Sequence, residues 1–241
     1  MLNFSDIKKS YGKTEIIKGV SGEIHQGEIT ALIGPSGSGK STLIRLLSLL
    51  ENPDSGKIEY DNGLLDFSNK KITIPSDYWP NVTVVFQQLY LWPHLTMMDN
   101  ILLPHKNNSS DEKWFKEKLD YLINFFELNE YLGRYPNQLS IGQRQRIAII
   151  RAIMLNPKYI LFDEVTASLD IEHIQKVKEV LLKEKAEGKG IIIATHLIGF
   201  AKAISDNIWF LEKGKFIEQG TKEILNKPKT ERFSKFLSLI E

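Results

Sequence analysis

The chain has 241 residues, of which 42% are hydrophobic, enough to bury a substantial core in one large domain or two small ones. Its 31 basic and 30 acidic residues nearly cancel, and they form no basic stripe, so we expect no nucleic-acid partner. It contains no cysteine, which excludes disulfides and thiolate metal sites.

The hydrophobic runs indicate a cytosolic chain that does not span a membrane by itself. The start, "MLNFSDIKKSYG", has no long apolar segment of a signal peptide. No apolar run approaches the roughly 20 residues that cross a bilayer, since Arg45 and Ser48 interrupt even "LIRLLSLL". The chain also has no internal repeat or flexible linker, so we predict a single domain over residues 1–241.

The first predicted elements are a strand, a loop and a helix. The apolar run "EITALI" predicts a strand over 28–33, and "KSTLIRLLSLL" predicts a buried helix over 40–50. A β-rich stretch follows, because "GKIEYDNG" and "NVTVVFQ" are rich in β-branched and aromatic residues and are bounded by Gly, Asn and Pro.

The middle of the chain is predicted to be helical. Ser109 and Glu112 have the spacing of a capping box, and apolar residues then recur at helical intervals. These apolar residues are Phe115, Leu119, Leu122, Ile123 and Phe126. A second helix is predicted to begin near Ser140 and to end at Asn156 and Pro157.

Strands and helices alternate again in the last third. We predict a strand over 159–164, a helix from about 171 to 187, a strand over 190–196, a further helix and a hairpin over 208–218. Alternation of this kind predicts an α/β fold with a mostly parallel sheet that is covered on both faces.

A glycine-rich loop follows the first of these strands. Residues 34–42, "GPSGSGKST", match the pattern G-x-x-x-x-G-K-[ST], which arises by chance in about one per cent of such chains. Glycines let backbone N–H groups converge on phosphates, and the following helix points its positive dipole end at the same place. The loop comprises Gly34, Pro35, Ser36, Gly37, Ser38, Gly39, Lys40, Ser41 and Thr42.

Two residues of this loop have predicted roles of their own. Lys40 would neutralise the β and γ phosphates of a nucleotide, and Ser41 would offer its hydroxyl to Mg²⁺. An ordinary turn between strand and helix explains neither Lys40 nor the preceding strand. We therefore expect ATP and Mg²⁺ at this loop.

Two carboxylates, Asp163 and Glu164, end the apolar strand "YILFDE", where open α/β sheets bind ligands. Successive strand side chains point to opposite faces, so the two acids would have different tasks if the strand continues. Asp163 would hold Mg²⁺ through water, and Glu164 would polarise the water that attacks the γ-phosphate. The alternative is an acid pair that stabilises the start of the next helix.

A small-molecule kinase or a GTPase would share these features, and "LSIGQRQR" is the stretch that discriminates. Its Ser140, Gly142 and Gln143 lie at a predicted helix start, which is a second receptor for an anion. Over almost its whole length the chain resembles the nucleotide-binding subunit of ATP-binding-cassette (ABC) transporters. In that family this signature closes on the nucleotide that another subunit holds, so the resemblance implies a homodimer on ATP binding.

The resemblance also implies a fold and further site residues. It implies a phosphate-loop core with an N-terminal antiparallel β subdomain and an inserted α-helical subdomain at about 93–156. Tyr11 resembles the aromatic that stacks on adenine, and Gln87, with Gln88 beside it, resembles the glutamine that senses Mg²⁺ and the γ-phosphate. Asp170 ends the loop "ASLD" that communicates across the dimer, and His196 resembles the switch histidine at the γ-phosphate.

Two positions depart from the family pattern. Ile141 stands where the signature usually has glycine, and a positive φ there would cost about 1 to 3 kcal/mol, whereas helical dihedrals would make it harmless. Val165 replaces the customary proline after the two acids, which we expect to affect loop stiffness more than chemistry.

Within the family, the chain looks most like the subunits of importers for polar amino acids. The resemblance implies separate integral membrane permease subunits, a separate solute-binding protein and a place on the cytoplasmic face of the cell membrane. The segment "LYLWPHLTMMDNILLP" is either the groove for a permease helix or the core of the helical subdomain. The alternatives are lipoprotein-release or peptide exporters, and cassette ATPases that act on DNA or ribosomes.

Overall fold

The computed structural model describes residues 1–61, 63–68, 72–104, 112–166 and 169–239. Ser109 of the predicted capping box and residues 167–168 of "ASLD" lie outside this part of the chain. Among the helices that the structure describes, none has the length and apolarity needed to cross a bilayer.

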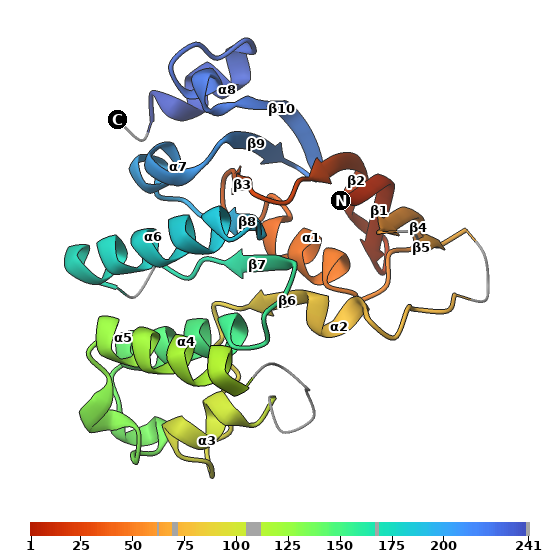
Figure 1. Cartoon of the computed structure of the whole chain (residues 1–241). Helices are drawn as coiled ribbons and strands as arrows, with labels where there is room; N and C mark the ends of the chain where they lie inside the picture. Colours follow the sequence, from red (N-terminus) through yellow and green to blue (C-terminus); the bar gives the residue numbers. More distant parts are fainter. Residues whose placement is uncertain (62, 69–71, 105–111, 167–168, 240–241) are drawn as a thin grey trace.

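A central sheet of six strands runs in the order β10-β9-β3-β8-β7-β6 (Figure 1). β9, β3, β8, β7 and β6 are mutually parallel, and β10 pairs with β9 as an antiparallel hairpin. The strands are β3 (Ile29–Ile33), β6 (Val82–Val85), β7 (Tyr159–Asp163), β8 (Gly190–Ala194), β9 (Asn207–Glu212) and β10 (Lys215–Thr221). The predicted α/β class and mostly parallel sheet are confirmed.

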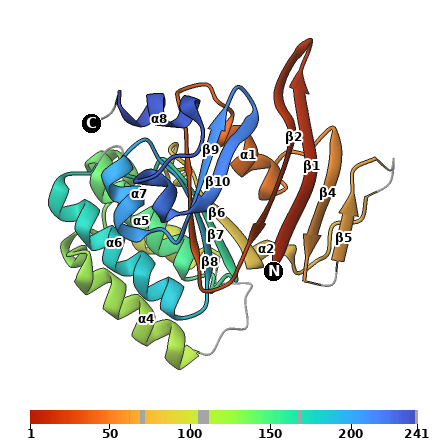
Figure 2. The same ribbon diagram turned by 90° about the horizontal axis from the view of Figure 1, so that it is seen from above.

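The central strands are apolar throughout because both faces of the sheet are covered. Every residue of β3, β7 and β8 is buried. Seen from above, one face carries α6 (Ile171–Ala186) and α7 (Ile198–Ile204), and the other carries α1 (Lys40–Leu47) (Figure 2). The prediction of a sheet covered on both faces is confirmed.

An antiparallel sheet with the order β2-β1-β4-β5 lies beyond α1 (Figure 2). Its strands are β1 (Leu2–Tyr11), β2 (Thr14–Ile24), β4 (Ser55–Tyr60) and β5 (Gly63–Asp66). Phe4 and Ile58 of this sheet share a buried apolar core with Leu43 and Leu47 of α1. The antiparallel β part that the family resemblance implies is therefore present, and α1 is held between the two sheets.

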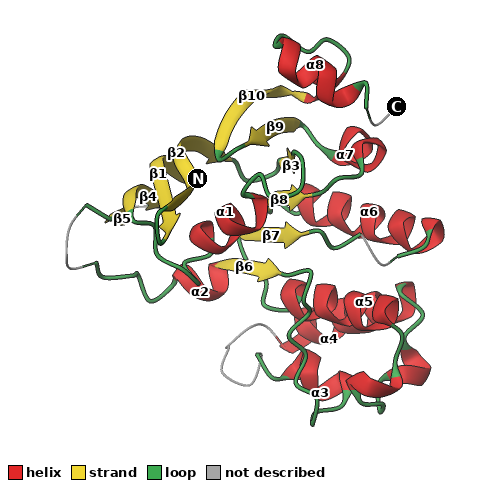
Figure 3. Ribbon diagram, turned by 180° about the vertical axis from the view of Figure 1, so that it is seen from behind, coloured by secondary structure: helices red, strands yellow, loops and turns green. Residues whose placement is uncertain are grey.

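A layer of helices lies beyond β6 (Figure 3). It contains α3 (Met97–Leu102), α4 (Glu112–Phe125), two short 3₁₀ turns (Asn129–Tyr131 and Pro136–Gln138) and α5 (Ile141–Ile153). The five apolar residues predicted to form one helix face, from Phe115 to Phe126, are all buried, which confirms the helical periodicity. A short helix α2 (Tyr78–Asn81) precedes β6.

Buried ion pairs join this layer to the core. Lys118 of α4 lies 2.7 Å from Glu184 of α6 and also pairs with Glu187, and all but a few per cent of the Lys118 and Glu184 side chains is buried. Burial opposes the charge on Lys118, but the hydrogen bonds to Glu184 and Glu187 raise its pKa. Lys176 of α6 pairs with Glu127 just beyond α4, so α4 is tied to α6 at two places.

Several predicted boundaries differ from the structure. The strand predicted to reach residue 196 ends at Ala194, the strand predicted to reach residue 164 ends at Asp163, and the helix predicted to continue until Asn156 ends at Ile153. The helix predicted over 40–50 ends at Leu47, because Ser48 caps it and Leu49 has a left-handed φ of 55°. The helix predicted up to residue 187 ends at Ala186, and Gly188 follows with a φ of 90°. The chain ends with the 3₁₀ turn η4 (Lys222–Leu225) and α8 (Glu231–Leu237).

Candidate nucleotide-binding site

A cavity of about 350 Å³ lies where β3 passes into α1, at the carboxyl edge of the parallel strands. This volume falls within the range of small-ligand pockets. Segments that are distant in the sequence line it: Tyr11, Ile16, the loop from Ser36 to Thr42, Gln87 and Glu164.

The backbone of the phosphate loop requires its glycines. Gly39 caps α1 with a φ of 109°, and an added Cβ would lie 2.8 Å from Ile17 Cδ1. A Cβ on Gly34 would collide with the carbonyl oxygen of Leu211. Because Gly39 has no side chain, no side-chain hydrogen bond caps α1, and its first N–H groups are left for a ligand.

Lys40 lies inside the loop. Its Nζ donates to the carbonyl oxygens of Gly34 at 2.9 Å and Pro35 at 3.2 Å, and the residue is 6% exposed. Burial lowers the pKa of Lys40, while the carboxylates of Glu164 and Asp163 oppose that shift. A phosphate placed against this ammonium would gain a charge-assisted hydrogen bond in a partly dry setting.

Ser38 offers a further polar group to the same loop. Its Oγ is buried and finds no hydrogen-bond partner among the residues that the structure describes. Buried hydroxyls are normally paired, so an unpaired one beside a glycine-rich loop fits a site built for a polar ligand.

Ser41 and Asp163 meet across the sheet edge. The Ser41 hydroxyl donates to Asp163 Oδ1 at 2.9 Å, and Asp163 is 4% exposed. Burial raises the pKa of Asp163, the nearby Glu164 charge adds to the shift, and the Ser41 hydrogen bond opposes it. A hydroxyl and a carboxylate are the oxygen donors that Mg²⁺ prefers alongside phosphate oxygens, so this pair fits that ion.

Glu164 does not continue the strand. β7 ends at Asp163, and Glu164 has a left-handed φ of 53° with its N–H donating to the carbonyl of Ala194. Asp163 and Glu164 were expected to point to opposite faces of the sheet only if the strand continued through both residues. That condition is not met. Glu164 nevertheless lines the nucleotide cavity, and Asp163 reaches the same loop through Ser41.

His196 lies beside Glu164. It follows β8, and its Nδ1 is 3.9 Å from Glu164 Oε2 while its side chain is 54% exposed. The adjacent parallel strands β7 and β8 thus place these two side chains at the same edge.

Gln87 and Gln88 differ in their positions. Gln87 follows β6 and lines the cavity with Glu164, whereas Gln88 does not line it. Arg151 of α5 fixes the next residues, since its guanidinium donates to the carbonyls of Leu89 and Tyr90, both at 2.9 Å. The sequence reasoning missed Arg151, for which the one available signal is a cation within the apolar run "IAIIRAI".

Tyr11 ends β1 at the rim of the cavity. It is 45% exposed, and its hydroxyl donates to Glu51 Oε2 at 2.6 Å. Burial and the Glu51 carboxylate raise the pKa of Tyr11. The sequence reasoning also missed Glu51 and the lining residue Ile16. Tertiary structure brings Glu51 to Tyr11 and Ile16 to the cavity.

The signature residues lie elsewhere. Ser140 caps α5 in a reciprocal box, with Gln143 N–H donating to Ser140 Oγ at 3.2 Å and Ser140 N–H donating to Gln143 Oε1 at 2.9 Å. Neither these residues nor Gly142 lines the cavity at the phosphate loop. Ile141 is the first residue of α5 and does not have a positive φ, so the backbone strain considered for this position does not arise.

Asp170 and Val165 flank the undescribed part of the loop after β7. Asp170 caps α6 by accepting hydrogen bonds from the His173 N–H at 2.9 Å and from His173 Nδ1 at 2.7 Å, which lower its pKa. Val165 is fully buried, and its carbonyl accepts a hydrogen bond from Gln145 Nε2 of α5. This bond connects the signature helix to the residue after Glu164.

A glycine-rich loop that opens a helix, with carboxylates at the end of another parallel strand of the same sheet, defines a phosphate-loop nucleotide-binding protein. The chain belongs to the ABC transporter family, whose model matches residues 17–167. It is an ATP-binding ATPase of that family.

Individual relatives match the whole chain. The arginine transport ATP-binding protein ArtM of Bacillus subtilis is 39% identical, with 100% of both chains covered. The glutamine transport ATP-binding protein GlnQ of Geobacillus stearothermophilus is also 39% identical, covering 100% of this chain and 99% of GlnQ. Among solved structures, the dimeric bacterial ABC transporter cassette MJ0796 is 30% identical with a TM-score of 0.81, covering 92% of this chain and 99% of MJ0796.

Proposed function

We propose that this chain hydrolyses Mg-ATP to power the import of a polar amino acid through separate membrane permease subunits. This proposal rests on one observation. The phosphate loop, the Ser41–Asp163 pair and the Glu164–His196 pair lie at the same edge of the sheet. The import assignment is supported by the relatives, whose names describe transport of arginine, glutamine and L-cystine.

ATP would lie in the 350 Å³ cavity with its base against Tyr11. The phosphates would accept hydrogen bonds from the loop N–H groups and from Lys40. Ser41 and Asp163, with Gln87 nearby, would hold Mg²⁺ beside the phosphates. Bound there, Mg²⁺ supplies positive charge that neutralises the phosphate oxygens as the terminal bond breaks.

Glu164 would orient a water molecule for attack and accept its proton. The water oxygen bonds to the γ-phosphorus while the bond to the β–γ bridging oxygen breaks, which yields ADP and inorganic phosphate. His196 would donate a hydrogen bond to the γ-phosphate. This role is supported by its distance of 3.9 Å from Glu164, which lines the cavity.

A second copy would complete each site. Ser140, Gly142 and Gln143 do not line their own cavity, so they would contact a nucleotide held by another chain. The dimeric form of MJ0796 supports such an arrangement. Asp170 would lie at the contact between the two copies.

The permease would dock on a groove near Gln87. Two cavities of about 540 and 230 Å³ share Leu50, Val84 and Arg151, and the exposed rings of Tyr90, Trp92 and Trp79 stand around them. In the segment 89–104, Met97 and Ile101 are fully buried, which supports a role in the core of the helical subdomain, whereas the exposed Tyr90 and Trp92 support the groove. Docking there would place the chain on the cytoplasmic face of the membrane, with a separate solute-binding protein on the other side.

The proposal is tested by transport itself. The chain would be co-purified with a candidate amino acid permease and reconstituted into vesicles together with a solute-binding protein for that permease. We expect ATP-dependent accumulation of labelled arginine, glutamine or cystine, and none with the Glu164→Gln variant. ATP hydrolysis that drives lipoprotein release or peptide export, without amino acid uptake, would contradict the import assignment.

A further inference from the structure

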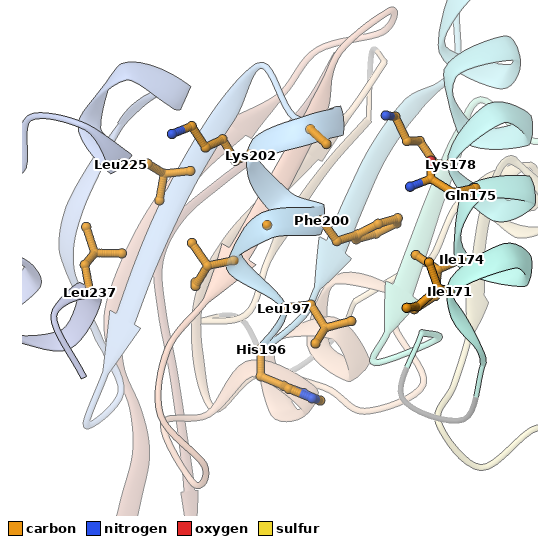
Figure 4. A pocket seen from close by; sticks show the side chains of 13 residues that line it. Ile171, Ile174, Gln175, Lys178, His196, Leu197, Phe200, Lys202, Leu225 and Leu237 are labelled. Atoms are coloured by element: carbon orange, nitrogen blue, oxygen red, sulfur yellow. The ribbon is translucent and has the colours of Figure 1, made fainter. Parts of the chain in front are cut away.

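A second hollow of about 570 Å³ lies beside the nucleotide site, along both sides of α7 (Figure 4). Ile171 and Ile174 of α6 face Leu197 and Phe200 across it. Its lining is therefore largely apolar at this end. We call this end, formed by Ile171, Ile174, Leu197 and Phe200, the α6–α7 groove.

Ile171 is unusually exposed for its residue type. It is the first residue of α6, and 80% of it is accessible, the largest fraction among the described large hydrophobic residues. Single exposed apolar residues are common on protein surfaces. Ile171, however, stands at the rim of an apolar hollow of its own chain, so a complementary surface would bury both.

The groove is continuous with the proposed dimer contact. His196 lines the hollow and also lies 3.9 Å from Glu164 in the nucleotide site. Ile171 directly follows Asp170, which the proposed dimer places at the contact between copies. A surface that covers the γ-phosphate side of the site would therefore extend over the end of the groove.

Charge limits the contact to that end. Lys178 and Lys202 line the part of the hollow that lies away from His196 (Figure 4). Two copies related by a two-fold axis present the same patch to each other, so like charges at the centre would oppose association. The described residues that form the apolar end, Ile171, Ile174, Leu197 and Phe200, carry no charge.

We propose that Ile171 of each copy inserts into the α6–α7 groove of a second copy, against Leu197, when the ATP dimer closes. This inference rests on the proposed ATP-dependent dimer and adds to it an apolar seam outside the nucleotide. An isologous dimer would contain the contact twice. Because Leu197 directly follows His196, the seam would make the position of His196 depend on whether the dimer is closed.

The first test measures dimer affinity in the hydrolysis-deficient Glu164→Gln background. Light scattering over a protein dilution series with saturating Mg-ATP would compare Ile171→Ser, Ile171→Leu and the parent. We expect Ile171→Ser to weaken dimerisation at least tenfold and Ile171→Leu to stay near the parent. Leu64→Ser is the matched control, because Leu64 is a 55% exposed apolar residue on β5.

Misfolding does not complicate the comparison, because Ile171 is exposed and serine is tolerated in the first turn of a helix. An Ile171→Ser dimer as tight as the parent dimer would overturn the seam while leaving the proposed function intact. A parent that stays monomeric with Mg-ATP would overturn the proposed dimer and the seam together.

A second test uses the absence of cysteine from the chain. Ile171→Cys and Leu197→Cys proteins, each carrying Glu164→Gln, would be mixed and treated with a short thiol crosslinker. We expect a covalent dimer of one chain of each kind, formed with Mg-ATP and not with Mg-ADP. A non-covalent dimer that never crosslinks between these positions would overturn the proposed contact.

Discussion

The N-termini of α1 and α5 would both contact one nucleotide in the proposed dimer, yet their first turns are built differently. At α1 the capping residue is Gly39, which leaves the first N–H groups without a side-chain partner. At α5 the Ser140–Gln143 box satisfies two N–H groups within the chain itself. The first is ready for a phosphate, whereas the second is closed on its own side chains.

This difference supports two separate steps, nucleotide binding by one copy and closure of the dimer for hydrolysis. Because no side chain caps the first N–H groups of α1, we expect the phosphate loop to bind ATP in one copy alone. In the proposed dimer, the signature would have to exchange its capping hydrogen bonds for contacts to a phosphate on another copy. Closure of the dimer would thus be a separate step, with a smaller gain in binding free energy than nucleotide binding.

The largest effect is expected at the α1 end. Lys40→Ala removes the buried cation, so we expect ATP affinity to fall about a hundredfold or more. Titration with a fluorescent ATP analogue would measure it, with Lys215→Ala of β10 as a surface control. Unchanged affinity in Lys40→Ala would place the phosphates elsewhere and remove the contrast between the two termini.

The next effect separates binding from hydrolysis. Glu164→Gln keeps the shape of the side chain but removes its ability to take a proton, so we expect the turnover number to fall about a hundredfold or more. ATP affinity in the same titration should stay within a few-fold of the parent. Hydrolysis at the parental rate would exclude Glu164 as the general base.

A smaller effect is expected at α5. Ser140→Ala removes the cap, which costs about 1 kcal/mol of helix stability, and removes a proposed phosphate contact. We expect ATP binding by the monomer to be unchanged and the rate of hydrolysis to fall about tenfold. If ATP binding weakens in parallel with hydrolysis, the two helix termini do not have separate roles.

The smallest effect is expected at Ile141. Because Ile141 already adopts helical geometry in α5, Ile141→Gly relieves no strain and costs about 0.5 to 1 kcal/mol of helix stability. We expect the dissociation constant of the ATP dimer to change less than about fivefold. A much tighter dimer in sedimentation measurements would mean that Ile141 obstructs the signature.

Local patterns in the sequence predicted most of the fold. The periodicity of the apolar residues from Phe115 to Phe126 identified α4, and the apolar strands β3, β7 and β8 were evident as continuous hydrophobic runs. The end of α1 at Leu47 was missed, because a left-handed Leu49 is not encoded by a glycine or a proline.

Tertiary contacts account for what the sequence did not predict at the site. The contacts Tyr11–Glu51 and Arg151–Leu89 join residues that are 40 and 62 positions apart. Glu164 leaves strand geometry although it is not glycine, so its direction could not be read from alternation. The groove beside Ile171 is likewise formed by separate helices, and no motif marks it.

The central claim is that the signature of one copy completes the nucleotide site of another. It is tested most directly by the molar mass of Glu164→Gln protein, measured by light scattering with and without Mg-ATP. We predict a monomer that becomes a dimer with Mg-ATP, and a Lys40→Ala/Glu164→Gln protein that stays monomeric in both conditions. A mass that does not change when bound ATP is demonstrated in the same sample would contradict the claim.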